Sequence, residues 1–334
     1  VESTYGDRLH DRSALPVDKL ADYIQRTLDR GGNLVIPSFA VGRTQEMLYF
    51  IREIKEKGLV RGHDGFPVYV DSPLANEATG IFLQTDTSYL EPEMRRLIRE
   101  GINPLWFDDL RTTTSQEESQ ALNTNKTPKV IISASGMCDA GRIRHHLKHN
   151  LWRKESMILF VGYQAVGTTG RKIQDGAKEV KLFSEDITVN AEIAYLPGRS
   201  GHADKDGLIR WITAFREKPA MVFVNHGEDE TVKSYASCLA DEYGFTVSAP
   251  YSGAVFDLLA GEYTAMPEGV PVAEGKAKAK QSRATDAFNA LVAACERLMS
   301  VIRGCKGIPN KELSRFTGQV NSLADKWSSW ADRG

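Results

Sequence analysis

The sequence lacks the long uninterrupted apolar stretch that a membrane-spanning helix requires. Such a helix needs about 18 or more consecutive apolar residues, and no window of these 334 residues approaches that length. A basic leader followed by an apolar run and a cleavage site is not found either. We therefore expect no membrane partner, and nothing in the sequence favours secretion.

Cysteine is scarce and scattered. The sequence has four cysteines (Cys138, Cys238, Cys295 and Cys305), and none of them forms a C-x-x-C pair. Disulfide frameworks and zinc knuckles require paired or closely spaced cysteines. The spacing therefore predicts free thiols, which is typical of a cytoplasmic protein.

An excess of charge of one sign is also missing. Lysine and arginine number 42 against 44 acidic residues, which gives a formal net charge of −2. A global basic field of the kind found on many nucleic-acid-binding proteins is therefore excluded, and any polyanion would have to be bound by local positive charge.

Short apolar runs alternate with helical patterns along the first part of the chain. The runs are rich in Val, Ile and Phe, and they lie at residues 34–38, 67–73, 129–136, 157–163 and 221–227. This alternation predicts an α/β fold with buried sheets. In such folds the site is built at the carboxyl ends of strands, where this sequence places Asp71, Ser133, Ser135 and His226.

The composition changes near the C-terminus. Residues 263–285 are rich in Pro, Gly, Ala and Lys and have little periodicity, so we predict a linker. Residues 286–334 carry apolar residues at helical spacing and form a predicted helical hairpin, broken at residues 307–309. This tail would dock on a partner or dimerise.

Two motifs resemble known sites without matching them. Residues 162–172 are similar to a phosphate-binding P-loop, but Thr168 stands where that loop needs lysine. His145 and His149 have the spacing of a zinc-protease helix, yet His146 replaces the glutamate base. A solvated basic helix face explains this segment best, although Arg142 and Arg144 could form a local phosphate-binding patch.

Two further histidines lie at a turn or at a strand end rather than on a helix face. His202 lies in the turn "SGHAD" before an amphipathic helix, and His226 ends an apolar strand before a second helix. A histidine at such a position is well placed for a metal or an anion, but it could equally be a capping or core residue. The pattern alone leaves both interpretations open.

Seven motifs then occur in order: "ESTYGDRLH", "IPSFAVGRTQEML", "VDSPLANEAT", "SASGMCDAGRIRHHL", "GYQAVGTTGRKI", "SGHAD" and "VNHGE". Together they resemble the β-CASP branch of the metallo-β-lactamase superfamily, the RNA-processing nucleases related to the cleavage and polyadenylation endonuclease. The resemblance covers roughly residues 1–262. It implies the C-terminal part of an αββα lactamase fold with an α/β β-CASP insertion, followed by a helical extension.

The resemblance also implies a domain order. Residues 1–7 would be the last strand of the first lactamase half, residues 8–165 the β-CASP domain, and residues 166–262 the second lactamase half. The linker and helical tail would follow. The metal-binding signature H-x-H-x-D-H of the family is absent from these 334 residues, so the chain resembles the second part of a longer protein whose N-terminal lactamase half is missing.

The roles of individual residues follow from the same resemblance. Glu2 would support His202, the proposed general acid at the scissile phosphate, and His226 would be a metal ligand. Ser200 and Gly201 match the phosphate-contacting loop of relatives, many of which carry an aromatic residue where this chain has Arg199. Further candidates for RNA contacts are Ser135, Arg43, Arg142, Arg144 and Arg171.

A complete enzyme of this family would hold two zinc ions and hydrolyse RNA. This chain supplies one predicted ligand, His226, and stable zinc sites use three or four protein ligands. We therefore expect the isolated chain to bind no zinc pair and to be inactive. The alternative is a non-catalytic RNA-binding or scaffold subunit, which the joint presence of Glu2, His202 and His226 disfavours.

Overall fold

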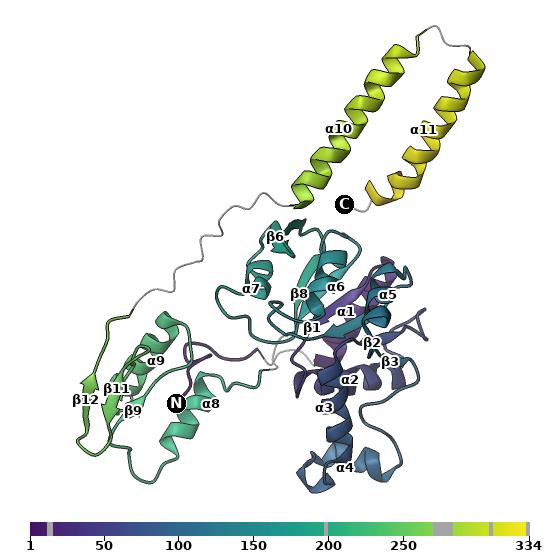
Figure 1. Cartoon of the computed structure of the whole chain (residues 1–334). Coiled ribbons are helices and arrows are strands. Elements are labelled where there is room, and N and C mark those ends of the chain that lie inside the picture. Colours follow the sequence, from purple (N-terminus) through teal and green to yellow (C-terminus); the bar gives the residue numbers. More distant parts are fainter. Residues whose placement is uncertain (12–15, 197–199, 270–282, 307–309, 332–334) are drawn as a thin grey trace. The chain divides into compact units, whose positions relative to one another are not determined.

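The structure is a computed structural model that describes residues 1–11, 16–196, 200–269, 283–306 and 310–331 (Figure 1). It has two compact units, which we describe separately. Unit 1 contains Val1–Ala14 and Pro197–Lys276, and unit 2 contains Leu15–Leu196 and Ala277–Gly334. Residues 307–309, where we predicted a break in the helical tail, and most of the predicted linker lie outside the described residues.

Unit 2 is built on a parallel sheet of six strands in the order β3-β2-β4-β1-β5-β8. The strands are β1 (Leu34–Pro37), β2 (Val68–Val70), β3 (Leu110–Thr112), β4 (Val130–Ser133), β5 (Met157–Phe160) and β8 (Glu192–Tyr195). A separate antiparallel hairpin consists of β6 (Glu179–Leu182) and β7 (Glu185–Thr188).

Helices connect the strands of unit 2. They are α1 (Pro16–Asp29), α2 (Arg43–Glu56), α3 (Pro73–Gln84), the 3-10 helix η1 (Thr87–Tyr89), α4 (Pro92–Arg99), α5 (Gln116–Thr124), α6 (Ile143–Asn150) and α7 (Thr169–Gln174). Local sequence fixes several of their starts: the Ser72 side chain caps α3, with proline at the next position, and Ser115 forms a capping box with Glu118 at α5. The tail forms α10 (Arg283–Gly304) and α11 (Asn310–Ala331).

The sheet is apolar on both faces. Within β1, Leu34 and Ile36 pack with α1 and α2, whereas Val35 packs with α6 and α7 on the opposite face. Successive side chains of a strand point to opposite faces, so a sheet covered on both sides needs continuous apolar runs. This explains why the runs in the sequence predicted β1, β2, β4 and β5.

A buried polar network closes the carboxyl end of β2. The Asp71 carboxylate, which is fully buried, accepts hydrogen bonds from Ser119 Oγ at 2.6 Å, His146 Nε2 at 2.5 Å, Arg142 at 2.7 Å and Thr113 Oγ1. Burial alone would raise the pKa of Asp71, but the hydrogen bonds outweigh it and hold the pKa well below its usual range. Asp71 and the buried Ser133, which bonds its carbonyl, are therefore structural groups rather than an open site.

Unit 1 combines two helices with two small sheets. The helices are α8 (Lys205–Thr213) and α9 (Asp229–Asp241). Strands β9 (Val222–Phe223) and β10 (Val247–Ser248) pair in parallel, and β11 (Val255–Asp257) and β12 (Glu262–Ala265) form an antiparallel pair. Its core joins α8, α9 and β9 through Leu208, Ile212, Val222, Tyr235 and Leu239.

The predictions on fold class are confirmed. The chain is α/β with a parallel sheet and C-terminal helices, and all five predicted strands are present, although each is shorter than its apolar run. The four cysteines are free, as predicted. Within the described ranges, no helix is both long and apolar enough to cross a membrane.

Replacing Asp71 by asparagine should destabilise unit 2, because His146 and Arg142 would lose the carboxylate that compensates their burial. We expect a loss of about 3–5 kcal/mol in the free energy of unfolding, measured with urea. The matched variant Asp175→Asn, which breaks the exposed pair with Arg171, should leave the urea midpoint nearly unchanged.

The same carboxylate should make stability depend on pH. Because the folded pKa of Asp71 lies below its unfolded value of about 4, its stabilisation is complete above that value and is lost as the pH falls below it. An Asp71→Asn chain that loses stability in acid as steeply as the wild type would contradict this assignment.

Candidate active site

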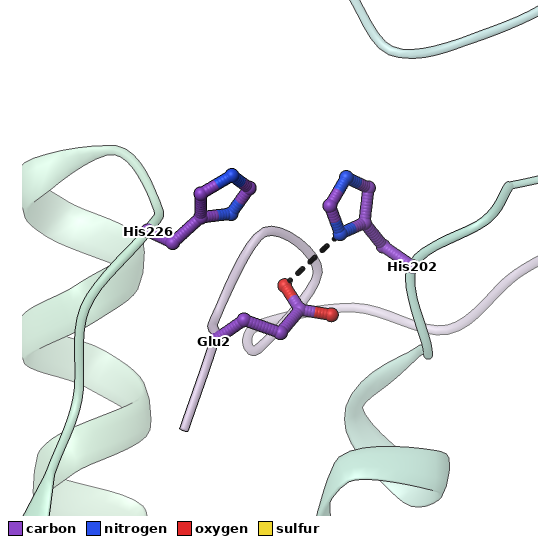
Figure 2. Close-up of side chains that lie close together, drawn as sticks. All are labelled: Glu2, His202 and His226. Carbon is purple, nitrogen blue, oxygen red and sulfur yellow. Dashed lines mark ion pairs between the residues drawn. The ribbon is translucent and has the colours of Figure 1, made fainter.

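Three side chains that the resemblance singled out lie together in unit 1. The ligand atoms of Glu2, His202 and His226 are all within 4.8 Å of one another (Figure 2). Among the residues that the structure describes, they form the one cluster of three or more His, Cys, Asp or Glu side chains at that spacing.

Backbone pairing brings the distant segments together. Glu2 forms a parallel β-bridge with Asn225, whose N–H donates to Val1 O at 3.0 Å. Tyr5, three residues further, bridges in parallel to Asp204, which caps α8 through Gly207 N at 3.0 Å. The extended N-terminal segment therefore passes both the end of β9, which precedes His226, and the turn that carries His202.

The turn at His226 is tight. His226 has a φ of 52°, in the left-handed region that non-glycine residues seldom adopt. Its carbonyl accepts hydrogen bonds from Ser3 N at 3.3 Å and Thr4 Oγ1 at 3.2 Å. A Cβ on the next residue, Gly227, would lie 2.5 Å from Ser3 Oγ, so glycine is needed for this close approach.

Glu2 and His202 form an ion pair. Glu2 Oε2 lies 3.3 Å from His202 Nδ1 and accepts a hydrogen bond from Thr4 N at 2.8 Å. Burial acts to raise the pKa of Glu2, but the hydrogen bonds from Thr4 and the contact with His202 outweigh it and lower the pKa. An ionised Glu2 therefore holds the Nδ1 side of His202, and the outer Nε2 points away from Glu2 (Figure 2).

Thr4 links the two histidines, and the sequence reasoning missed it. Its buried hydroxyl lies 3.4 Å from His202 Nδ1 and 3.1 Å from His226 Nδ1. The signal was available: in an extended segment, side chains two residues apart share a face, so a strand-end Glu2 places Thr4 on the same side. We assign Thr4 as a positioning residue for both rings.

The hydrogen bonds of Thr4 also indicate the tautomer of His226. A hydroxyl has one proton, and Thr4 Oγ1 donates it to the His226 carbonyl at 3.2 Å. When the hydroxyl proton goes to the carbonyl, Thr4 Oγ1 accepts from a protonated His226 Nδ1 across the 3.1 Å contact. This leaves the lone pair of Nε2 available to a metal, as is usual for a zinc-binding histidine whose other nitrogen is hydrogen-bonded.

The three groups fit part of a zinc site rather than a whole one. A catalytic zinc ion uses about three protein ligands at about 2.0–2.2 Å. Glu2 Oε2 and His202 Nδ1 instead contact each other directly at 3.3 Å. The cluster could offer one ligand atom from each of its three residues to a metal ion, but the contact between Glu2 and His202 engages a carboxylate oxygen and Nδ1.

A cavity adjoins His226 on the side of α9. Its volume is about 670 Å³, and residues of both polar and apolar character line it, among them Asn225, Lys233, Pro250 and Tyr251. The Tyr251 hydroxyl donates to Asp229 Oδ1 at 3.0 Å. A nucleotide-sized group therefore has room beside His226.

The predicted phosphate-contacting loop lies next to His202. Ser200 Oγ accepts a hydrogen bond from His202 N at 3.1 Å, so this serine shapes the turn that carries the histidine. No heavy atom would lie within 4 Å of a Cβ on Gly201, so packing does not require glycine there. Arg199 lies outside the described residues.

The remaining candidates belong to unit 2, and its own side chains engage each arginine. Arg43 pairs with Glu46, Arg142 with Asp71, and Arg171 with Asp175, while Arg144 lies 4.4 Å above the Phe183 ring. Ser135 N donates to Ala140 O in the loop after β4. Their roles as RNA contacts stay predictions, and Arg142 has a structural role that its sequence context did not indicate.

The comparison with known proteins agrees with the architecture. Residues 44–173 match the model of the Beta-Casp domain, and residues 186–250 match the model of the Zn-dependent metallo-hydrolase RNA specificity domain. The domain boundaries predicted at residues 7, 165 and 262 stay predictions.

Curated relatives match most of the chain. It is 35% identical to "Ribonuclease TTHA0252" of Thermus thermophilus over 241 residues, which are 72% of this chain and 53% of the relative. It is 35% identical to "Transcription termination factor FttA" of Methanosarcina mazei (71% and 38%) and 31% identical to "RNase J-like protein" of Methanocaldococcus jannaschii (77% and 58%). The chain thus spans about half the length of such relatives, or less.

Thr4→Val should remove the hydroxyl while keeping the shape of the side chain. We expect a loss of about 0.5–1.5 kcal/mol in the unfolding free energy, because the hydrogen bonds between the buried Thr4 hydroxyl and the exposed His226 are lost, and a changed ¹⁵N shift of His226 Nδ1 in NMR spectra. Thr4→Ser should behave like the wild type in both measurements. Equal Nδ1 shifts in the valine and serine variants would remove Thr4 as a positioning residue.

Proposed function

Because the chain belongs to the β-CASP branch of the metallo-β-lactamase superfamily, we propose that the complete protein hydrolyses RNA phosphodiester bonds with a zinc cofactor. The observation that carries this proposal is the contact between Glu2 and His202 beside the outer nitrogen of His226. A non-catalytic relative would have no need for these three groups in one place.

In this proposal Glu2 and His202 act as an acid pair. Glu2 Oε2 lies 3.3 Å from His202 Nδ1 and orients the ring. The proton on the outer Nε2 would then be transferred to the leaving 3′ oxygen of the RNA as the bond to phosphorus breaks. Thr4 restrains the ring, so that the proton is delivered from a fixed position.

His226 would supply one metal ligand through Nε2, with its Nδ1 proton held by Thr4. Bound zinc supplies a Lewis acid and an activated water nucleophile. The signature H-x-H-x-D-H that would provide further ligands is absent from these 334 residues. We therefore propose that this chain alone does not hold the two zinc ions of the complete site and does not cut RNA.

A non-catalytic RNA-binding subunit is the second candidate. One observation favours it: Glu2 and His202, two of the three groups in the described residues that could hold a metal, contact each other at 3.3 Å. The sequence that precedes Val1 in the gene decides between the two, since H-x-H-x-D-H upstream indicates an enzyme and its absence indicates a scaffold.

We also propose that the helical tail binds the tail of a second copy of the chain. Large apolar side chains are exposed on both tail helices, including Leu291 and Met299 of α10 and Leu323 and Trp327 of α11. Two isolated helices bury only part of their apolar surface, and a second hairpin would complete a four-helix bundle. Sedimentation of the chain with and without α10–α11 tests this proposal.

Two substitutions in the complete protein should separate proton transfer from metal binding. His202→Ala should lower kcat about 10²–10⁴-fold with the zinc content unchanged, because the residue donates a proton but binds no metal. His226→Ala should lower both zinc content and activity. Cleavage of end-labelled RNA and metal analysis provide the two measurements, with His63→Gln as a control far from any proposed role.

The isolated 334-residue chain gives a further expected outcome. Titration with zinc followed by dialysis should leave less than the two ions of a complete site, because one histidine is a weak site alone. Labelled RNA should stay intact. Stoichiometric zinc together with cleavage by this chain would refute the proposed division of the site.

A further inference from the structure

Strands β1 and β4 of unit 2 are neighbours whose following connections leave on opposite faces of the sheet. β1 continues into α2, which packs on the face of Leu34 and Ile36, whereas β4 continues into α6, which packs on the face of Val35. The carboxyl ends of two strands at such a topological switch point are where α/β sheets bind ligands.

Phe39 lies at this switch point and is held there firmly. Its carbonyl accepts hydrogen bonds from Thr44 N at 3.2 Å and Thr44 Oγ1 at 2.8 Å. A Cβ on Gly136, in the loop after β4, would lie 3.0–3.1 Å from the edge of the Phe39 ring. One edge of the ring therefore packs against the backbone of the neighbouring loop, and this contact fixes the orientation of the side chain.

The other part of Phe39 is exposed. The residue keeps 47% of its surface accessible, which is unusual for a phenylalanine whose backbone and ring edge are both fixed. Three loops meet beside it: Ser38 N donates to Ser133 O at 3.0 Å, and Gln164 of the loop after β5 donates to Gly136 O at 2.9 Å. The exposed ring thus rests on loops that hydrogen bonds hold in place.

We propose that Phe39 is a stacking platform for an unpaired base of single-stranded RNA. This inference rests on the proposed function, since it supplies the substrate-binding surface of unit 2. A rigid ring loses little entropy on binding, and every base has a π face, so stacking would hold RNA without selecting its sequence. Ser135 follows β4 and Arg43 begins α2 after β1; both were predicted to contact RNA, and Phe39 adds the contact for the base.

The test measures binding of fluorescein-labelled oligoadenylate RNA to the 334-residue chain. Phe39→Leu keeps apolar packing on Gly136 but removes the π face, and it should weaken binding about 5- to 150-fold, as expected for the loss of one stacked base. Phe39→Trp keeps an aromatic face and should bind as tightly as the wild type. Tyr89→Leu, which removes another aromatic residue that is 83% exposed, should bind as the wild type does.

A second measurement separates stacking from a structural effect. With 2-aminopurine in the RNA, the wild type and Phe39→Trp should quench its fluorescence, whereas Phe39→Leu should not. The slope of affinity against salt concentration should be the same for Phe39→Leu and wild type, because no phosphate contact is lost. A lowered slope, or unchanged affinity of a folded Phe39→Leu chain, would overturn the inference, as would failure of the wild type to bind.

These outcomes are distinct from failure of the proposed function. If the complete protein cuts RNA while Phe39→Leu binds like the wild type, the stacking platform is wrong and the nuclease stands. If the complete protein does not cut RNA but binding and quenching depend on Phe39, the platform stands and the chain is an RNA-binding subunit.

Discussion

The arrangement of the candidate site depends on the pairing of the first five residues with the end of β9. Ser3 Oγ donates to Asn225 O at 2.9 Å across a separation of 222 positions in the chain. Closing a loop of that length costs chain entropy. The hydrogen bonds that form in this one register offset that cost. A shift by one residue would turn Glu2 and Thr4 to the opposite face of the segment, and the contacts with both histidines would be lost together.

Thr4 converts this register into a rigid site. Its N–H fixes Glu2, and its hydroxyl contacts the carbonyl and ring of His226 and the ring of His202. The left-handed backbone of His226 costs about 1–3 kcal/mol, and the hydrogen bonds from Ser3 and Thr4 to its carbonyl help to hold it. Strain concentrated at one histidine, next to a glycine that admits Ser3, is typical of a residue whose direction matters for function.

The sequence predicted the parts of the fold whose pattern reflects burial on two sides. Strands β1, β4 and β5 are continuous apolar runs because helices cover both faces. Strand β3 has one buried residue in three, β6 alternates exposed and buried positions, and β7 alternates half-buried and exposed ones, over four residues each. Such short elements are stabilised by their neighbours rather than by their own pattern, so local periodicity did not reveal them.

The site was harder to predict than the fold, because the sequence around a strand-end residue does not reveal which distant side chains it contacts. Glu2, His202 and His226 were identified through the family resemblance, whereas Thr4 and Phe39 depend on contacts between segments distant in sequence. Arg142 looked like a phosphate contact from its place in a basic segment. In the structure it compensates a buried carboxylate, which sequence spacing could not indicate.

Asp71 and Glu2 show how two strand-end carboxylates differ in kind. Asp71 is fully buried and accepts from Arg142, His146, Ser119 and Thr113, so its charge is compensated in every direction and fixed for stability. Glu2 keeps 28% of its side chain exposed, and its partner His202 keeps 37%. A carboxylate whose oxygens both accept hydrogen bonds inside the core is not available to bind a further group. One that contacts a single accessible imidazole can orient that ring and leave its outer nitrogen open to solvent. Solvent access to the partner, rather than the carboxylate itself, therefore distinguishes the structural group from the one that we propose as part of the site.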